Sequence, residues 1–419
     1  ETGVASIPVH LALRCGAPAP ERHASSPFDL AFVLRLLHLS NWFPETETPH
    51  RTPFIAEHLE ALAPFVQQQL WHVEVQEPQQ LQRAWRLQLA DRGGGRHALL
   101  LRAPVRSWQL REGLTLALLL LLRLRLWRGG WDLVVVHIAY PLLRFPRLVR
   151  LLFGRRLLLI EHWSAYHTDF QLPPGSPARR RLQGMFAADI PVVAVSQALA
   201  QDICRFVGRP ALPVSVVPNA IDTDLFHPTL HHVHSSGGSP ETSRFLMVAS
   251  WAPVKRPLLV FEAVRALRAQ FPAVCLRVIG SGEQLASMRA FVQAHQLEAV
   301  IQLLGPQPKS RIAAELRAAT ALLHPSAYET FSVVCAEALC CGVPVLASAV
   351  GALPELIGPT NGRLVANTPK AWTDALRDWL QQPPAWDRAA IARQASARFS
   401  RAAVGCQLFQ QAEAAARRG

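Results

Sequence analysis

The sequence predicts an α/β protein made of two domains, each built around a parallel sheet. Short, mostly aliphatic runs alternate with helical patterns along the chain, and strands of that composition are typical of sheets covered on both faces. The chain has 419 residues, which is too long for one ordinary core and suits two domains of about two hundred residues each. The same alternation begins again after a linker-like stretch near the middle of the sequence.

In the first half, the pattern predicts a helix at residues 54–62 and a series of buried strands. Each strand is a run rich in Leu, Val or Ile that ends at polar or turn-forming residues. These strands are expected at residues 34–39, 133–138, 157–161, 192–195 and 214–217. In the second half, a strand at 245–249, a helix at 257–270 and a strand at 275–279 repeat the pattern.

Shifts in composition suggest the domain boundaries. A loose segment rich in Pro, Ala and Ser is expected at residues 1–28, and it lacks the basic start and clean apolar core of a signal peptide. The first domain should cover 29–228, a linker 229–243 and the second domain 244–385. Residues 386–419 are expected to form C-terminal helices.

Apolar residues make up 50% of the chain and charged residues 17%, which argues for a globular protein and against disorder. The cysteines form no Cys-x-x-Cys pair, so neither a zinc site nor a disulfide framework is indicated, and a reducing compartment is the default. They occupy positions 15, 204, 275, 335, 340, 341 and 406.

The positive charge is concentrated in the first half of the chain. The formal net charge is +13, and residues 101–160 hold eleven arginines against Glu112 and Asp132. Such a surface suits an anionic membrane or the phosphates of an acceptor, although a merely solvated face is the alternative. Nucleic acid is not expected as a partner, because basic and aromatic residues are not interleaved and no known module is present.

The leucine-rich run at residues 114–127 resembles a membrane span at first sight. Its apolar stretch is well below the roughly 20 residues needed to cross a bilayer, and Arg123 and Arg125 interrupt its end. We therefore expect a buried helix between two strands, with a helix lying at a membrane interface as the alternative.

Residues 326–357 carry the most informative motif of the chain. Glu329 follows an apolar strand and the sequence His-Pro-Ser, which places it in a loop at the carboxyl edge of a sheet, where ligands bind. A helix is expected to begin near Phe331, and its free amides suit a phosphate. Glu337 lies eight positions after Glu329 and about two helical turns along. An acid on each side of an anion site fits a sugar nucleotide.

This motif resembles the donor site of the retaining GT-B glycosyltransferases of family 4, also called group 1, whose hallmark is two glutamates separated by seven residues. The segment Gly351-Ala-Leu-Pro-Glu-Leu-Ile357 is similar to the family's Gly-Gly-x-Pro-Glu-Leu-Ile, with Ala352 in place of one glycine. The resemblance implies two Rossmann-like domains facing across a cleft, with a C-terminal helix crossing back to the first domain. It also implies that Glu329 contacts the transferred sugar and Glu337 the nucleotide ribose, with Thr330, Phe331 and Ser332 completing the donor site.

A second segment, Ser250-Trp-Ala-Pro-Val-Lys-Arg256, resembles the family's phosphate-binding stretch. The chain has only three lysines among its 43 basic residues, and one of them, Lys255, falls on the motif's lysine. In the family this lysine neutralises the donor diphosphate. Ser250 replaces the family's arginine, so Arg256 is expected to share that role.

On the acceptor side, His137 and His162 each follow an apolar strand directly. The segment Glu161-His-Trp-Ser resembles a bacterial polysaccharide-synthesis branch of the family, and His162 matches the histidine placed beside the reacting sugar. His137 matches the histidine of the family's His-x-x-x-Pro loop. For both residues a buried, hydrogen-bonded structural histidine is the alternative.

The resemblance implies an enzyme of the hexosyltransferase type. It would move a sugar from a nucleoside diphosphate sugar to a glycan or polyprenyl-linked acceptor with retention of configuration, and His162, Lys255 and Glu329 would be its central residues. No metal or other cofactor is expected, and the cluster His231, His232 and His234 lacks a carboxylate or cysteine partner nearby in sequence. The expected location is the cytoplasm or the inner face of the cytoplasmic membrane. An epimerase acting on nucleotide sugars and a non-catalytic scaffold remain as alternatives.

Overall fold

The computed structural model describes residues 33–43, 53–76, 85–154, 156–229 and 243–418. Contacts divide the chain into two compact units. The first holds the described residues up to His137, together with Pro141–Leu158 and Arg401 onward, and the second holds Ile138–Tyr140 and Leu159–Ser400. The expected loose segment 1–28 and the histidine cluster of the linker lie outside the described residues.

The first sheet has the strand order β3-β4-β2-β1-β5-β6-β7-β8. Strand β1 runs parallel to β2 and β5, β2 to β4, and β7 to β6 and β8, whereas the edge strand β3 is antiparallel to β4. The strands are β1 (Arg35–Ser40), β2 (Gln67–Gln76), β3 (Arg86–Asp91), β4 (Arg96–Arg102), β5 (Leu133–His137), β6 (Leu157–Glu161), β7 (Val192–Ala194) and β8 (Val214–Val216).

The described helices of the first unit are α2 (Pro53–Leu62), α3 (Trp108–Arg125), α4 (Pro146–Phe153) and α14 (Arg401–Arg417). The C-terminal helix α14 packs on α2, as the family resemblance implied. Gly405 allows this close approach, because a Cβ atom there would lie 2.1 Å from the carbonyl oxygen of Ala61. The rings of Phe65 and Phe409 stack at 5.5 Å beside this contact.

Helix α3 contains the leucine-rich run, and it is buried along one face only. Leu118, Leu119 and Leu122 are buried, whereas Leu121 and Leu124 are exposed. The expectation of a buried helix therefore holds for half of its surface. Within the described residues, no helix combines the length and the apolar character needed to cross a membrane.

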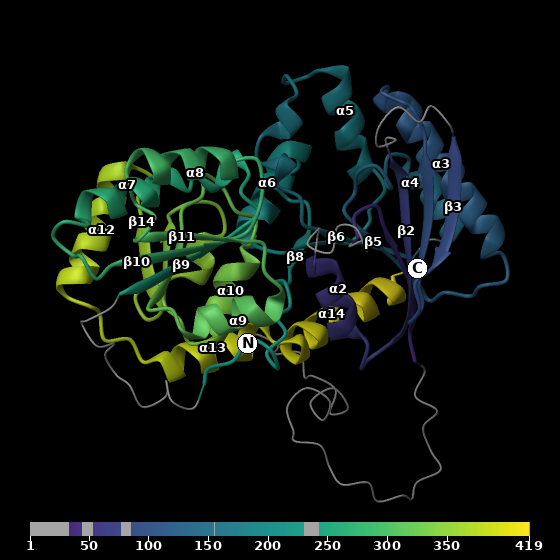
Figure 1. Ribbon diagram of the computed structural model, residues 1–419. Coiled ribbons are helices and arrows are strands. Elements are labelled where there is room, and N and C mark those ends of the chain that lie inside the picture. Colours follow the sequence, from purple (N-terminus) through teal and green to yellow (C-terminus); the bar gives the residue numbers. More distant parts are fainter. Residues whose placement is uncertain (1–32, 44–52, 77–84, 155, 230–242, 419) are drawn as a thin grey trace, which may run out of the picture. The chain divides into compact units, whose positions relative to one another are not determined.

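The second sheet lies wholly in the second unit and has the order β11-β10-β9-β12-β13-β14, with all pairs parallel. Helices cover both of its faces, with α7, α8 and α12 on one and α9, α10 and α13 on the other (Figure 1). The strands are β9 (Arg244–Val248), β10 (Cys275–Ile279), β11 (Ile301–Gly305), β12 (Ala321–His324), β13 (Val345–Ser348) and β14 (Gly362–Val365). The helices of this unit are α5 (Pro177–Gln183), α6 (Gln197–Val207), α7 (Leu258–Leu267), α8 (Leu285–Ala294), α9 (Lys309–Arg317), α10 (Val333–Cys340), α11 (Leu353–Leu356), α12 (Pro369–Gln381) and α13 (Arg388–Phe399).

The architecture is α/β with two Rossmann-like sheets, as the sequence predicted. The division into units differs from the expected boundaries at two places. All of residues 159–228, which include α5, β7, α6 and β8, group with the second unit, and α6 is hydrogen-bonded to Tyr328 and Glu355 of that unit. Helix α13 also stays in the second unit, so only α14 returns to the first.

Candidate functional site

Lys255 and Glu329 meet at the carboxyl edge of the second sheet. Lys255 ends the short 3-10 turn η5 (Pro253–Lys255) after β9, and Glu329 lies in the loop after β12, the parallel neighbour of β9. The two loops are joined by a hydrogen bond of 2.7 Å from the Ala327 amide to the Val254 carbonyl. The Lys255 Nζ atom then lies 2.5 Å from Glu329 Oε1. The topology therefore brings together two residues that are far apart in sequence.

His324 completes this ionic centre, and the sequence had shown it only as part of the His-Pro-Ser motif. Its Nε2 atom lies 2.8 Å from Glu329 Oε1 and 3.2 Å from the hydroxyl of Ser332. Burial alone would raise the pKa of Glu329, but the charges and hydrogen bonds of Lys255 and His324 outweigh it and hold the pKa well below its usual range. Glu329 is therefore a fixed carboxylate at neutral pH.

The donor helix α10 begins at Val333, two residues after the expected start at Phe331. Ser332 delays it, because this residue has the left-handed φ of 77° at the N-cap position. Phe331 is buried and Thr330 partly buried in the same turn. Glu337 lies within α10 and is half-buried. The predicted donor residues of this segment therefore belong to one continuous loop and helix, namely Glu329, Thr330, Phe331, Ser332 and Glu337.

Three buried cysteines accompany α10. Cys335 and Cys340 lie on the helix and Cys341 follows it. Burial raises the pKa of each thiol to about 12. These side chains are therefore neutral parts of the core behind the donor helix.

Gly351 lets the Pro-Glu segment approach Glu329 closely. The amide of Ala352 donates a 2.9 Å hydrogen bond to the carbonyl of Glu329. Gly351 has a φ of 51°, and a Cβ atom there would lie only 2.2 Å from the same carbonyl oxygen. Ala352, which replaces the family's second glycine, has an ordinary φ of −81°. The first glycine is thus required by geometry, and the second is not.

Ser250 and Arg256 are both exposed in the segment before α7. Arg256 has a left-handed φ of 45° and donates a hydrogen bond of 3.4 Å to the Asn367 carbonyl. The turn formed by residues 280–282 after β10 packs on this segment. The Trp251 amide donates a 2.8 Å hydrogen bond to the Ser281 carbonyl, and a Cβ atom on Gly282 would lie 2.7 Å from the nitrogen of that amide.

Two contacts of the donor loops were not foreseen from the sequence. The Tyr328 hydroxyl donates a hydrogen bond to Asp202 on α6, and the Tyr328 ring stacks on His167 with centroids 3.7 Å apart. The Glu355 carboxylate accepts bonds of 2.9 and 2.7 Å from the first two amides of α6, those of Gln197 and Ala198. The sequence around Tyr328 and Glu355 could not predict these contacts, because the partners lie more than a hundred positions away.

His162 follows β6 in a turn that is organised by Glu161. This buried carboxyl accepts hydrogen bonds of 2.8 to 3.0 Å from the amides of Ala139, His162 and Trp163 and from the hydroxyl of Tyr166. Burial raises the pKa of Glu161, and these four donors oppose that rise. Glu161 is thus the residue that holds the backbone of His162.

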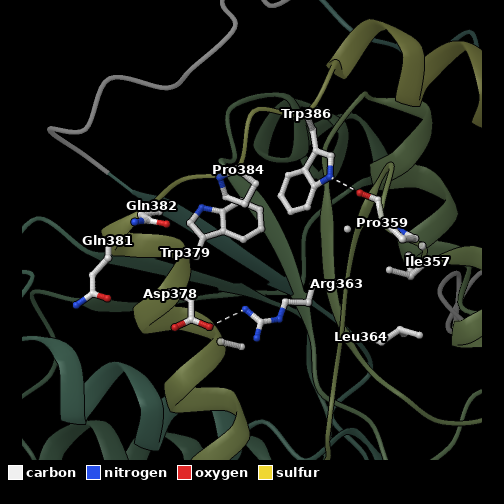
Figure 2. Close-up of a pocket in the computed structure, with 13 residues that line it drawn as sticks. Ile357, Pro359, Arg363, Leu364, Asp378, Trp379, Gln381, Gln382, Pro384 and Trp386 are labelled. Carbon is white, nitrogen blue, oxygen red and sulfur yellow. Dashed lines mark hydrogen bonds and ion pairs between the residues drawn. The ribbon is translucent and has the colours of Figure 1, made fainter.

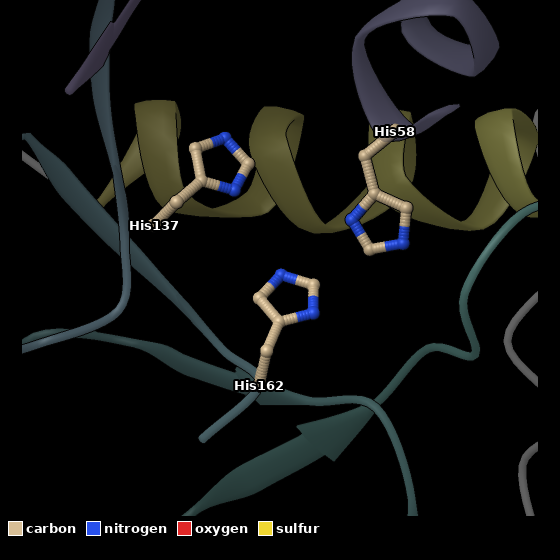
Figure 3. Close-up of side chains that lie close together, drawn as sticks. All are labelled: His58, His137 and His162. Atoms are coloured by element: carbon tan, nitrogen blue, oxygen red, sulfur yellow. The ribbon is translucent and has the colours of Figure 1, made fainter. Parts of the chain in front are cut away.

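His137 lies at the end of β5 in the first unit and is fully buried. Its Nε2 atom lies 3.0 Å from the Nδ1 atom of His38 on β1. Burial and the charge of His58 lower the pKa of His38 to about 3, although a side-chain interaction with Gln68 opposes this shift, so His38 is neutral. Figure 3 labels the side chains of His137 and of His58 on α2, both of which belong to the first unit.

Comparison with known protein families gives two matches. The model described as Glycosyl transferases group 1 matches residues 234–398, and the model described as Glycosyltransferase Family 4 matches residues 55–225. The first match contains the whole segment from Lys255 to Glu337, and the second contains His137 and His162.

Among curated proteins, a D-inositol 3-phosphate glycosyltransferase of Corynebacterium glutamicum is 31% identical over 231 residues, covering 52% of this chain and 55% of the relative. The enzyme of the same name from Xylanimonas cellulosilytica is 34% identical over 263 residues, covering 57% of this chain and 61% of the relative. The matched part thus spans little more than half the length of these relatives.

Solved structures show the same fold over most of the chain. A sucrose-phosphate synthase from Thermosynechococcus elongatus has a TM-score of 0.71 at 19% identity, covering 92% of this chain and all of the other. Anabaena HepE, solved in complex with UDP, has a TM-score of 0.67 at 16% identity and covers 91% of this chain and all of its own.

Proposed function

Because the chain belongs to the GT-B glycosyltransferases of family 4, we propose that it transfers a sugar from a nucleoside diphosphate sugar to a glycan or lipid-linked acceptor. The observation that carries this proposal is the contact of Glu329 with both Lys255 and His324, inside the segments that resemble the family's donor site. UDP is the nucleotide we favour, since HepE was solved with UDP and with UDP-glucose.

In this proposal each part of the donor is bound by different residues. Lys255 and Arg256 neutralise the diphosphate, Glu329 contacts hydroxyls of the sugar, and Glu337 binds the ribose. As the sugar–phosphate bond breaks, negative charge grows on the leaving diphosphate, and a nearby ammonium lowers the energy of that transition state. Glu329 holds the lysine in place beforehand, so little reorganisation is needed at the moment of reaction.

The reaction is proposed to retain the anomeric configuration. Glu329 is already engaged by two cationic or hydrogen-bonding partners, which makes it a poor nucleophile. The leaving phosphate is then the group that accepts the proton of the acceptor hydroxyl on the same face of the sugar. Proton NMR of the product would give the configuration, and an inverted anomer would overturn this part of the proposal.

The donor site is tested by screening UDP-, GDP-, ADP- and TDP-sugars for thermal stabilisation and slow hydrolysis. We expect one nucleotide class to stabilise the protein, with loss of binding in Lys255→Ala and loss of hydrolysis in Glu329→Gln. Lys370→Ala is the matched control, because that lysine side chain is 87% exposed and pairs with its helix neighbour Asp374. Equal binding by wild type and Lys255→Ala would contradict the assignment.

The same screen separates the two other functions that the sequence left open. An epimerase would change the sugar of the donor without any acceptor, whereas a transferase gives only slow hydrolysis. A scaffold would bind no nucleotide sugar although it is folded. We favour transfer to a bacterial surface polysaccharide or a lipid-linked intermediate, because of the Glu161-His-Trp-Ser resemblance.

We also propose that the outer surface of α3 and α4 binds an anionic membrane. The Arg123 Nε atom donates a 2.6 Å bond to the Leu152 carbonyl, which holds the two helices together. Large apolar side chains are exposed there, with Leu124 at 70%, Trp127 at 64% and Leu151 at 79%. The exposed arginines of this surface are Arg125, Arg128 and Arg147.

Leucine and tryptophan side chains between arginines fit a headgroup layer, where apolar groups enter and arginines meet phosphates. The test is flotation with vesicles of phosphatidylcholine alone or with anionic phosphatidylglycerol. We expect binding to the anionic vesicles only, weakened by salt and lost in a Leu124→Glu, Leu151→Glu variant. Binding that ignores these substitutions would remove the membrane from the proposal and leave donor binding untouched.

A further inference from the structure

A cavity of about 770 Å³ in the second unit shares no lining residue with the Lys255–Glu329 centre. Its size lies within the range of roughly 300–1,000 Å³ that is usual for small-molecule sites. The walls come from β14, from α12 and from the segments before and after them. The lining residues used below are Pro359, Arg363, Asp378, Trp379, Gln382 and Trp386.

One wall of this cavity is aromatic. The rings of Trp379 and Trp386 pack with centroids 4.9 Å apart and an interplanar angle of 43°. Trp386 is fixed from the other side, since its indole nitrogen donates a 2.9 Å hydrogen bond to the Pro359 carbonyl (Figure 2). Trp379 is only 5% exposed, so the partly exposed ring of Trp386, held between Trp379 and Pro359, is the aromatic surface that a ligand would meet, and its ordering on binding costs little.

The remaining wall is polar and close to neutral. Arg363 and Asp378 form an ion pair of 2.9 Å, and their side chains are 49% and 57% exposed (Figure 2). Gln382 is exposed at the end of α12. Strand β14 is the edge of its sheet, so within the described residues no strand pairs with its outer side. Hydrogen-bond donors and acceptors are thus both available.

This combination selects a class of ligand. Among the described residues that line the cavity, Arg363 and Asp378 are the charged ones, and their charges cancel. The cavity therefore offers no net positive charge to a nucleotide or another phosphate. A sugar ring has an apolar C–H face and a rim of hydroxyls that both donate and accept. An indole surface facing a carboxylate, a guanidinium and an amide suits both properties.

We infer that this cavity is a second binding site, for a neutral oligosaccharide, distinct from the donor site. The binding itself does not depend on transfer activity. Only the further step, that the bound chain is the acceptor or product of this enzyme, rests on the proposed function. A site of this kind would keep a growing glycan attached to the protein between successive encounters with donor.

The test is isothermal titration calorimetry of the full chain with maltohexaose, cellohexaose and mannohexaose. We expect at least one to bind, and Trp386→Ala to weaken that binding at least tenfold. A second variant, Arg363→Gln with Asp378→Asn, keeps both tryptophans and the net charge, and it should also weaken binding at least tenfold. Trp85→Ala is the control for a lost tryptophan, because that residue is 56% exposed and belongs to the first unit. Melting temperatures check that every variant is folded.

Binding must also persist in Glu329→Gln and with saturating UDP, since the cavity is separate from the donor site. Loss of binding under either condition would place the sugar at the donor centre and overturn the inference. So would the absence of binding by all three oligosaccharides, or unchanged binding in both cavity variants. Failure of the donor proposal is recognised separately, because it leaves this titration unchanged and abolishes only nucleotide binding.

Discussion

At Gly351 the absence of one Cβ atom allows two loops to meet. We predict that Gly351→Ala destabilises the protein by about 1–3 kcal/mol, because the added atom meets the Glu329 carbonyl oxygen at 2.2 Å and the φ of 51° is strained for alanine. Urea unfolding gives the free energy. Gly113→Ala on α3 is the control, since nothing lies within 4 Å of its Cβ position, and it should stabilise the helix by about 0.5–1 kcal/mol. Equal effects at the two sites would refute the geometric argument.

The carboxylate of Glu329 sets a pH dependence of stability. Its pKa in the folded protein lies below its ordinary value of 4.5, so folding favours the ionised form. The stabilisation is complete above about pH 4.5 and is lost as the pH falls from there toward the folded pKa. We predict that the difference in melting temperature between wild type and Glu329→Gln is constant from about pH 6 to 8 and changes below pH 4.5. A difference that varies most near neutral pH would contradict this assignment to Glu329.

Individual site residues differed in how far the sequence revealed them. Lys255 and Glu329 were found from the family's motifs, and the rarity of lysine strengthened the choice. His324 was visible beside Pro325 and Ser326, but its bond to Glu329 depends on how the loop after β12 folds back. Asp202 could not be predicted as a site residue, because its partner Tyr328 is distant in sequence and neither residue belongs to a motif that links them.

At the scale of elements, Glu355 acts as a cap on α6 that comes from another part of the chain. Its carboxylate accepts two amide hydrogen bonds at the positive end of that helix, so we predict that Glu355→Ala costs about 1 kcal/mol. Hydrogen exchange should quicken in the first turn of α6. Glu413→Ala is the control, because its i,i+4 pair with the 76% exposed Arg417 is worth about 0.5 kcal/mol or less. Ser196 is the N-cap residue of α6, and its side chain accepts a hydrogen bond from the Leu199 amide. Unchanged exchange in α6 would show that this cap is sufficient without Glu355.

Elements with aliphatic strands were predicted best. Residues 157–161 and 275–279 coincide with β6 and β10. Strands β2, β3 and β4 were missed. Strand β3 is an exposed edge strand, whereas β2 and β4 lie inside the sheet, and their short apolar runs are flanked by Gln, Arg and His residues that hide the aliphatic pattern. The start of α10 was placed two residues early, since the left-handed Ser332 gives no signal in sequence.

At the scale of the molecule, every predicted donor residue from Ser250 to Glu337 belongs to the second unit. We therefore predict that UDP slows hydrogen exchange most in residues 250–256 and 326–337. The effect should disappear in Lys255→Ala and persist in Lys370→Ala. Protection confined to α2 and α14 would mean that the nucleotide binds to the first unit instead.

The division into units was the hardest property to foresee. Sequence reasoning placed the boundary at the linker near residue 229, where composition changes. The contacts instead group α6 with the donor loops, through Asp202 and Glu355, and leave α14 with α2. Amino-acid composition indicates which segments are linkers, whereas the compact units are defined by contacts between residues that are distant in sequence.

The three buried thiols in and after α10 allow the rate at which this helix opens to be measured. A thiol-specific reagent such as Ellman's reagent reacts with the thiolate, and Cys335, Cys340 and Cys341 are both enclosed and held protonated by a pKa of about 12. Their labelling must wait until this helix opens. The partly exposed Cys204 and Cys275 react first, and the slow phase of colour that follows them reports how often α10 and its surroundings open.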